Sequence, residues 1–222
     1  MKHILEADSI QLEFSGRKIL SDIYFKAETG KITGLLGRNG AGKSCLMKIV
    51  YGSMECEKSV RFDNRSQPEA FKYPALLLYL PQFNFIPKSL TAKQVFRHFQ
   101  LDFSLFESRF PECRDYFKQP VGKLSGGGQR LIELYVIAVS PSQFAMLDEP
   151  FSHLSPMQIE KVKLLLQEEK QNKGFLITDH LYEHITGISD HLYILANGKT
   201  HLAKNVHDIE RWGYVRADNC LL

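Results

Sequence analysis

The chain has 222 residues, of which 44% are hydrophobic, so it is long enough for one large core and too short for two independent enzymes. Its net charge of +3 comes from interspersed signs, and composition gives no reason to expect nucleic acid as the main partner. The four cysteines lie far apart, without metal-ligand or disulfide spacing, which favours a reducing cytosol. The N-terminus lacks a signal-peptide pattern, and no apolar run approaches the roughly 18 residues of a membrane span. We therefore expect one catalytic unit, with a separate anchor if it works at a membrane.

The first third of the chain predicts short strands. Alternating or apolar stretches at residues 10–14 and 23–25 flank a turn-like SGRK at residues 15–18, which predicts antiparallel strands. Residues 32–36 (ITGLL) read as a buried strand, and residues 41–51 as a helix with an apolar face. Residues 60–62 predict a weaker strand.

GRNGAGKS, at residues 37–44, connects the buried strand to this helix and includes the first residues of the helix. It is the complete phosphate-binding loop pattern. Its glycines let backbone NH groups point inward around phosphate oxygens, Lys43 adds a cation, and Ser44 supplies a hydroxyl to Mg²⁺. A glycine-rich turn that binds nothing would leave Lys43 unexplained at the start of a helix. The nucleotide-binding residues predicted here are Gly37, Arg38, Asn39, Gly40, Ala41, Gly42, Lys43, Ser44 and Cys45.

The middle of the chain changes character after an apolar run. Residues 75–80 predict a buried strand that runs into Pro81 and Gln82, and the pattern then becomes helical and irregular. Thr91 is a suitable cap for a helix through residues 95–99. We predict a single domain, residues 1–222, in which a helical subdomain (83–140) is inserted into a phosphate-binding core (1–82 and 141–222).

The last third returns to strands. Residues 144–148 and 175–178 are apolar strands, and residues 192–202 read as a hairpin around Asn197 and Gly198. Strands that alternate with helices imply a parallel sheet. The predicted fold class is α/β: a P-loop NTPase core with a mixed, largely parallel sheet, an N-terminal antiparallel β portion and an inserted helical subdomain. The tail after Lys204 receives no predicted role.

Two carboxylates end the strand at residues 144–148. Asp148 and Glu149 are thereby placed at the carboxyl edge of the sheet, where α/β proteins hold ligands. There Asp148 can bind Mg²⁺, and Glu149 can act as general base toward a water that attacks a γ-phosphate. A solvated acidic turn is the alternative, and it is disfavoured because Pro150 stops the chain directly after the pair.

A second anion nest is predicted at LSGGGQ, residues 124–129, which we call the signature segment. Its glycines open a helix, and Ser125 adds a hydroxyl beside Gly126 and Gly127. One nucleotide seldom needs two such loops from one subunit. The pattern therefore favours a dimer in which each signature segment completes the partner's site.

Taken together, GRNGAGKS, LPQ at residues 80–82, LSGG, FAMLDEP and ITDH resemble, in order and spacing, the motifs of an ABC ATPase domain. The sequences of these motifs most resemble those of the ATPases of lipopolysaccharide exporters and branched-chain amino-acid importers. The resemblance covers nearly the whole chain and implies head-to-tail dimers that sandwich two ATP molecules. It also implies that Phe14 stacks on adenine, that Gln82 reaches Mg²⁺ and the attacking water, and that His180 contacts the γ-phosphate.

The function implied is ATP binding and hydrolysis that drives transport. The expected partners are a second ATPase chain, identical or homologous, and a transmembrane permease that holds the protein at the cytoplasmic face of a membrane. Some ABC ATPases serve soluble assemblies instead, and a scaffold ATPase such as one for iron-sulfur cluster assembly is the open alternative. Substrate and direction are not expected to be encoded in an ATPase subunit.

Two positions depart from the family pattern. Gly128 stands where a Gln or Glu usually follows LSGG, and Ser155 stands where an Asp usually ends the loop after the catalytic Glu. Ser155 nevertheless forms a capping box with Gln158 at the start of a helix.

A competing motif is present at residues 180–184. His180, Glu183 and His184 spell H-x-x-E-H, a spacing that can bind zinc. No third ligand is evident, and His180 directly follows an apolar strand, where the family places its histidine. We therefore expect His184 to be an exposed helix residue.

Overall fold

The computed structural model describes residues 2–180, 182–203, 208–209 and 212. Two sheets organise them: a six-stranded sheet in the order β11-β10-β4-β9-β8-β7, and a five-stranded sheet in the order β2-β1-β5-β6 with β3 also paired to β1. In the first sheet only the β10–β11 pair is antiparallel. In the second sheet every pair is antiparallel. The predicted largely parallel core and N-terminal antiparallel portion are therefore confirmed.

The elements follow one another as strands first, then helices alternating with strands. The strands are β1 (Ile4–Phe14), β2 (Arg17–Leu20), β3 (Tyr24–Glu28), β4 (Ile32–Gly37), β5 (Glu57–Phe62), β6 (Arg65–Ser66), β7 (Leu77–Leu80), β8 (Phe144–Asp148), β9 (Gly174–Thr178), β10 (His191–Ala196) and β11 (Lys199–Ala203). The α-helices are α1 (Lys43–Tyr51), α2 (Ala92–His98), α3 (Phe103–Arg109), α4 (Gly126–Val139), α5 (Pro156–Glu169) and α6 (Tyr182–Thr186). Short 3-10 turns are η1 (Ala70–Lys72), η2 (Pro111–Tyr116) and η3 (Val121–Lys123).

Several predicted boundaries differ from the observed ones, and three of them were wrong for clear local reasons. The first strand begins at Ile4 because residues 4–8 pair with β3 and residues 5–8 also pair with β5, which a single strand's pattern does not reveal. The turn between β1 and β2 is confined to Ser15 and Gly16, both at positive φ, and Arg17 already belongs to β2. Helix α1 begins at Lys43 because Gly42 has φ of 103°, outside the helical region.

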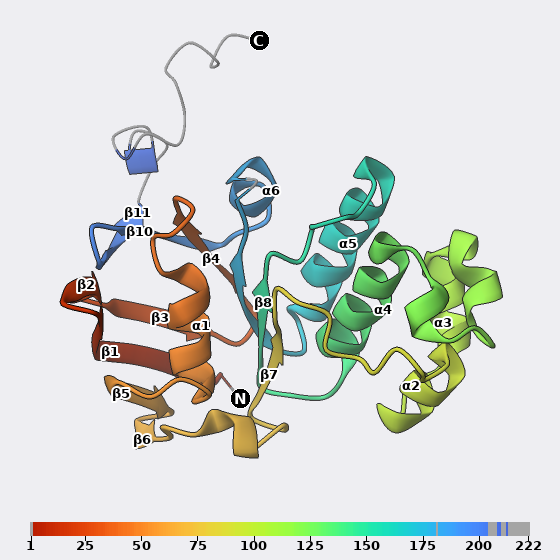
Figure 1. Ribbon diagram of the computed structural model, residues 1–222, viewed down its shortest axis with the longest axis horizontal. Coiled ribbons are helices and arrows are strands. Elements are labelled where there is room, and N and C mark those ends of the chain that lie inside the picture. Colours follow the sequence, from red (N-terminus) through yellow and green to blue (C-terminus); the bar gives the residue numbers. More distant parts are fainter. Residues whose placement is uncertain (1, 181, 204–207, 210–211, 213–222) are drawn as a thin grey trace, which may run out of the picture.

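The parallel sheet is covered on both faces, which explains its nearly unbroken apolar strands. Along β8, Phe144 and Met146 belong to the core shared with α1 and the antiparallel sheet. Ala145 and Leu147 face the opposite core, which contains α5, α4 and the other helices of the 83–140 segment. Figure 1 shows α1 beside the antiparallel strands, and α4 and α5 between the parallel sheet and α2–α3.

Side-chain caps begin α2, α4 and α5, and the caps at Thr91 and Ser155 are the ones that the sequence predicts. Thr91 begins α2 and Ser155 begins α5, each with a reciprocal capping box through the Gln three residues later. Ser125 caps α4 through a hydrogen bond from Gly128 N to its Oγ at 3.1 Å. The α5 cap stays intact although residue 155 lacks the carboxylate usual in the family.

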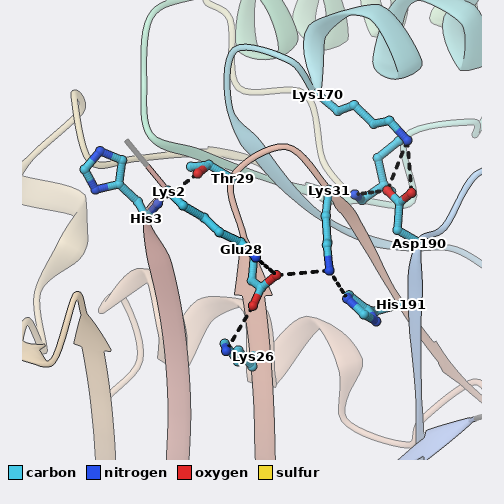
Figure 2. Close-up of polar contacts among 10 residues, drawn as sticks. Lys2, His3, Lys26, Glu28, Thr29, Lys31, Lys170, Asp190 and His191 are labelled. Atoms are coloured by element: carbon cyan, nitrogen blue, oxygen red, sulfur yellow. Dashed lines mark hydrogen bonds and ion pairs between the residues drawn. The ribbon is translucent and has the colours of Figure 1, made fainter.

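Ion pairs tie the sheets together at the amino edge of the parallel sheet, where β4 and β10 begin (Figure 2). Glu28 lies within 2.8 to 3.1 Å of the ammonium groups of Lys2, Lys26 and Lys31. These lysines, with Lys2 the largest contributor, lower the pKa of Glu28 to about 2. Lys31 Nζ also lies 2.8 Å from His191 Nε2, which links this cluster to β10. Glu28 therefore joins the antiparallel sheet to the core.

No helix among the described residues is long and apolar enough to cross a membrane. The tail after Lys204 lies outside the described residues except for residues 208–209 and 212. Of these, Trp212 stacks on His201 with ring centroids 4.4 Å apart.

Candidate functional site

The phosphate loop curls between β4 and α1 as its glycines predict. Gly40 and Gly42 both have positive φ, at 79° and 103°, which non-glycine residues rarely adopt. Lys43 lies almost fully buried behind this curl and donates from Nζ to Gly37 O at 2.6 Å. Burial lowers the pKa of Lys43, while the charges of Glu149, Asp148 and Asp179 oppose that shift. The loop thus holds a cation whose charge is only partly compensated.

A cleft of about 560 Å³ opens in front of the loop. Its side chains come from six separate parts of the chain: the end of β1, β2, the loop with α1, and the segments that follow β7, β8 and β9. Its lining residues are Phe14, Ile19, Asn39, Gly40, Gly42, Lys43, Ser44, Cys45, Gln82, Glu149 and His180. Arg38 and Ala41 line an adjoining cavity on the other side of the loop.

Asp148 lies beneath Ser44 rather than in the cleft lining. Its Oδ1 accepts a hydrogen bond from Ser44 Oγ at 3.2 Å, and its Oδ2 accepts one from Tyr79 OH at 3.1 Å. Burial raises the pKa of this carboxyl above its usual range, and the two hydrogen bonds oppose the shift. A buried carboxylate beside a hydroxyl is an oxygen donor set suited to Mg²⁺, so the residues present fit the ion that the sequence implies.

Glu149 is held in an unusual backbone conformation at the end of β8. Its φ is 50°, and its N donates to Thr178 O at 2.7 Å across to β9. Its Oε2 accepts from Gln82 Nε2 at 2.8 Å and lies 3.9 Å from His180 Nδ1. The three polar side chains predicted to act on one phosphate therefore meet at one wall of the cleft.

Arg130 is a residue of this site that the sequence reasoning missed. It is 1% exposed and donates to the backbone oxygens of Pro81 at 2.6 Å, Asp148 at 2.5 Å and Glu149 at 2.9 Å. Glu133, one turn later on α4, accepts from the N–H groups of Phe85 and Ile86 at 2.8 and 3.1 Å. Helix α4 thereby fixes both the Gln82 segment and the carboxylate pair. The sequence feature that could have revealed this role is the presence of two charged residues, Arg130 and Glu133, in a mostly apolar helix.

The signature segment does not line the cleft of its own chain. Ser125 and Gly126 are exposed at the start of α4. A Cβ on Gly127 would lie 2.4 Å from His153 O, so the loop after Glu149 packs directly on the segment and requires glycine there. The predicted second anion nest is therefore presented outward, away from Lys43.

The zinc interpretation gains no support. Within residues 2–180, 182–203, 208–209 and 212, no group of three or more His, Cys, Asp or Glu is arranged to hold a metal ion. His184 was wrongly expected to be exposed: it is half-buried, and its ring packs on Phe151 at 5.5 Å because α6 folds back over the loop after β8.

Known proteins are similar to most of this chain in sequence and in fold. The model of the ABC transporter family matches residues 20–152. The lipopolysaccharide export system ATP-binding protein LptB of Haemophilus influenzae is 29% identical over 88% of each chain. A branched-chain amino acid transport ATP-binding protein, LivF of Archaeoglobus fulgidus, is 28% identical over 82% of this chain and 83% of its own. The solved structure of an ATP-binding subunit of an ABC transporter superposes with a TM-score of 0.79 at 22% identity, covering 96% of this chain and 95% of its own.

Proposed function

Because this chain belongs to the ABC transporter family and is an ATP-binding, ATP-hydrolysing subunit of it, we propose that two copies close head to tail around two ATP molecules. The observation that carries the proposal is the separation of the two anion nests. The loop and its carboxylates share one cleft, while Ser125 and Gly126 are exposed outside it. A second copy can supply the missing half of the site.

Nucleotide binding follows from the lining of the cleft. Phe14 is 50% exposed at the end of β1 and offers an aromatic face to the adenine. The NH groups of the phosphate loop and Lys43 receive the phosphates. Since Lys43 is bonded to a backbone carbonyl before ATP arrives, the ligand exchanges a neutral partner for a negative one.

The metal ion is assigned to the oxygen donors under the loop. Ser44, Asp148 and Gln82 would hold Mg²⁺, which would supply positive charge for the β and γ phosphate oxygens. Tyr79 keeps Asp148 in place through its hydrogen bond.

Hydrolysis is assigned to the wall formed by Glu149, Gln82 and His180. Glu149 accepts the proton of a water whose oxygen forms the new bond to the γ-phosphorus, while the bond from that phosphorus to the bridging oxygen breaks and ADP leaves. Gln82 orients Glu149 and the water, since it already donates to that carboxylate. His180 donates to the γ-phosphate. The Arg130 hydrogen bonds to the Asp148 and Glu149 carbonyls keep this wall rigid.

The proposed partner in the membrane is a permease that docks beside Gln82. Phe83, next to it, is 63% exposed, whereas Phe85 is half-buried and packs on the core of the 83–140 segment. Phe83 is therefore the stronger of these two aromatic candidates for the docking contact. Attachment through such a partner would place the protein at the cytoplasmic face of a membrane.

Two experiments test the proposed dimer and the proposed membrane partner. Glu149→Gln keeps the size and hydrogen bonding of the side chain but removes the base, so the variant should bind ATP, elute as a dimer with ATP and turn over very slowly. Asp190→Asn, remote from the cleft, is the matched control. A variant that stays monomeric with ATP and hydrolyses normally would contradict the proposal. Recovery of the tagged wild type without any membrane protein would favour a soluble scaffold assembly.

A further inference from the structure

Asp148 is a buried carboxylate whose two oxygens face different elements of the fold. Its Oδ1 accepts from Ser44 Oγ at 3.2 Å, in the first turn of α1, and its Oδ2 accepts from Tyr79 OH at 3.1 Å, on β7. Asp148 is 1% exposed, so these two hydroxyls, rather than bulk water, set its orientation. An ion beside Ser44 therefore meets Oδ1, while Oδ2 faces β7.

The position of Tyr79 follows from strand pairing and from helix packing. In the parallel pair of β7 and β8, Tyr79 is aligned with Met146, so its side chain lies on the face of the sheet that also carries Met146 and Asp148. On that face the Tyr79 ring packs on Tyr51 of α1, with ring centroids 5.1 Å apart. Tyr51 follows Ser44 by about two helical turns. One helix therefore supplies both the hydroxyl that faces Oδ1 and the ring that supports the phenol facing Oδ2.

The Tyr79 hydrogen bond restricts how the carboxylate can turn. The terminal torsion of an Asp side chain is broad, so an unrestrained carboxylate can rotate to offer both oxygens to one ion. Rotation of Asp148 toward the phosphate loop would move Oδ2 away from Tyr79 and leave a half-buried phenol hydroxyl without this acceptor. As long as the hydrogen bond is kept, Asp148 offers a single oxygen to an ion beside Ser44.

The number of oxygens offered matters differently to Mg²⁺ and to Ca²⁺. Mg²⁺ requires near-octahedral geometry at about 2.0–2.1 Å, whereas Ca²⁺ takes about six to eight oxygen ligands and accepts both oxygens of one carboxylate. We infer that Tyr79 is a positioning residue that limits Asp148 to one metal-facing oxygen and thereby favours Mg²⁺ over Ca²⁺ beside ATP. The inference rests on the proposed nucleotide and metal site and adds to it a residue outside the family motifs. A hydroxyl that only satisfied a buried carboxylate would affect stability and not the choice of ion.

The first test removes only the Tyr79 hydroxyl. Nucleotide titration of Glu149→Gln protein, with Mg²⁺ and separately with Ca²⁺, gives the ATP dissociation constant for each ion. With Tyr79→Phe added, the preference for Mg²⁺ should fall by about five- to tenfold, as expected for one lost hydrogen bond to a carboxylate, while ATP affinity in EDTA stays the same. Tyr24→Phe is the matched control, because it removes a similar bond, from a phenol to Glu6, outside the cleft. An unchanged preference for Mg²⁺ in Tyr79→Phe would overturn the inference.

The second test separates this inference from the metal site on which it rests. Ser44→Ala removes a proposed ligand of the ion, so in the same Glu149→Gln background it should weaken ATP binding with Mg²⁺ and with Ca²⁺. If Ser44→Ala weakens binding with neither ion, the assignment of the metal to the oxygens under the loop fails, and the inference falls with it. If Ser44→Ala weakens binding with both ions and Tyr79→Phe leaves the preference for Mg²⁺ unchanged, the inference alone is overturned.

Discussion

The two edges of the parallel sheet gather charged side chains in opposite ways. At the amino edge, Glu28 is surrounded by three lysines, and its pKa is lowered to about 2. At the carboxyl edge, Asp148 accepts hydrogen bonds from the neutral hydroxyls of Ser44 and Tyr79, and burial raises its pKa. Within the described part of the chain, Lys43 is hydrogen-bonded only to the Gly37 and Arg38 carbonyls.

This difference in pairing distinguishes charges that stabilise the fold from charges that are available to bind a ligand. Ion pairs that are complete in the folded chain favour the folded state, and they leave no capacity for a ligand. Charges that are buried with neutral partners cost folding free energy, and they become paired when an anion or a cation binds. The amino edge therefore serves stability, and the carboxyl edge is the one proposed to bind ATP.

Arg130 is the exception at the carboxyl edge, and replacing it should give the largest loss of stability. Arg130→Met leaves three backbone oxygens without their donor and Glu133 without its cation 3.9 Å away. We expect the free energy of unfolding to fall by about 3–5 kcal/mol. Denaturant unfolding measures it, with Arg130→Met/Glu133→Met as the matched variant that should recover part of the loss. A change below ~1 kcal/mol would show that this cation is not part of the scaffold.

Lys43 should show the reverse behaviour. Lys43→Met removes a buried cation that faces a neutral partner, so thermal stability without ATP should stay the same or rise. ATP affinity should fall by about 1.5–3 kcal/mol, because a charge-assisted contact is lost. Nucleotide titration and thermal unfolding of the same sample check both parts. Unchanged ATP affinity, or a large loss of stability without ligand, would break the contrast between the edges.

Glu28 provides the pH test at the amino edge. Its folded-state pKa is about 2 against an ordinary value of 4.5, so its contribution is fully present above pH ~4.5 and is lost as pH falls toward 2. Glu28→Gln should lower the free energy of unfolding by about 1–2 kcal/mol at pH 7 and by much less near pH 2. Acid unfolding curves of the two proteins should therefore converge. Curves that stay parallel down to pH 2 would assign the loss to packing instead.

Ser155 should give the smallest effect. Ser155→Ala removes the cap of α5, which is worth about 1 kcal/mol, while ATPase turnover per folded dimer should barely change. Ser155→Asp should keep the cap and, where the family contact can be rebuilt, strengthen ATP-dependent dimerisation. A large turnover loss in stably folded Ser155→Ala would place its hydroxyl at the dimer seam.

The sequence by itself determined the local chemistry of this protein. The conformation of GRNGAGKS is set within its own eight residues, because its glycines can adopt positive φ and its lysine stands at the start of a helix. The apolar run before Asp148 places that carboxylate at a strand end, and Ser155 and Gln158 cap their helix within one turn. Such features depend on neighbours along the chain, so pattern and propensity suffice to read them. The role of Phe14, by contrast, came from the family resemblance and remains a prediction.

Only the tertiary structure decided which distant groups meet. Tyr79 and Asp148 are 69 residues apart, and Arg130 lies 49 residues from the Pro81 carbonyl to which it donates. The parallel pairing of β7 with β8 brings the first pair together, and the packing of α4 beneath both strand ends brings the second. Side-chain contacts of this kind leave no periodic signal, because each depends on the angle at which two elements pack.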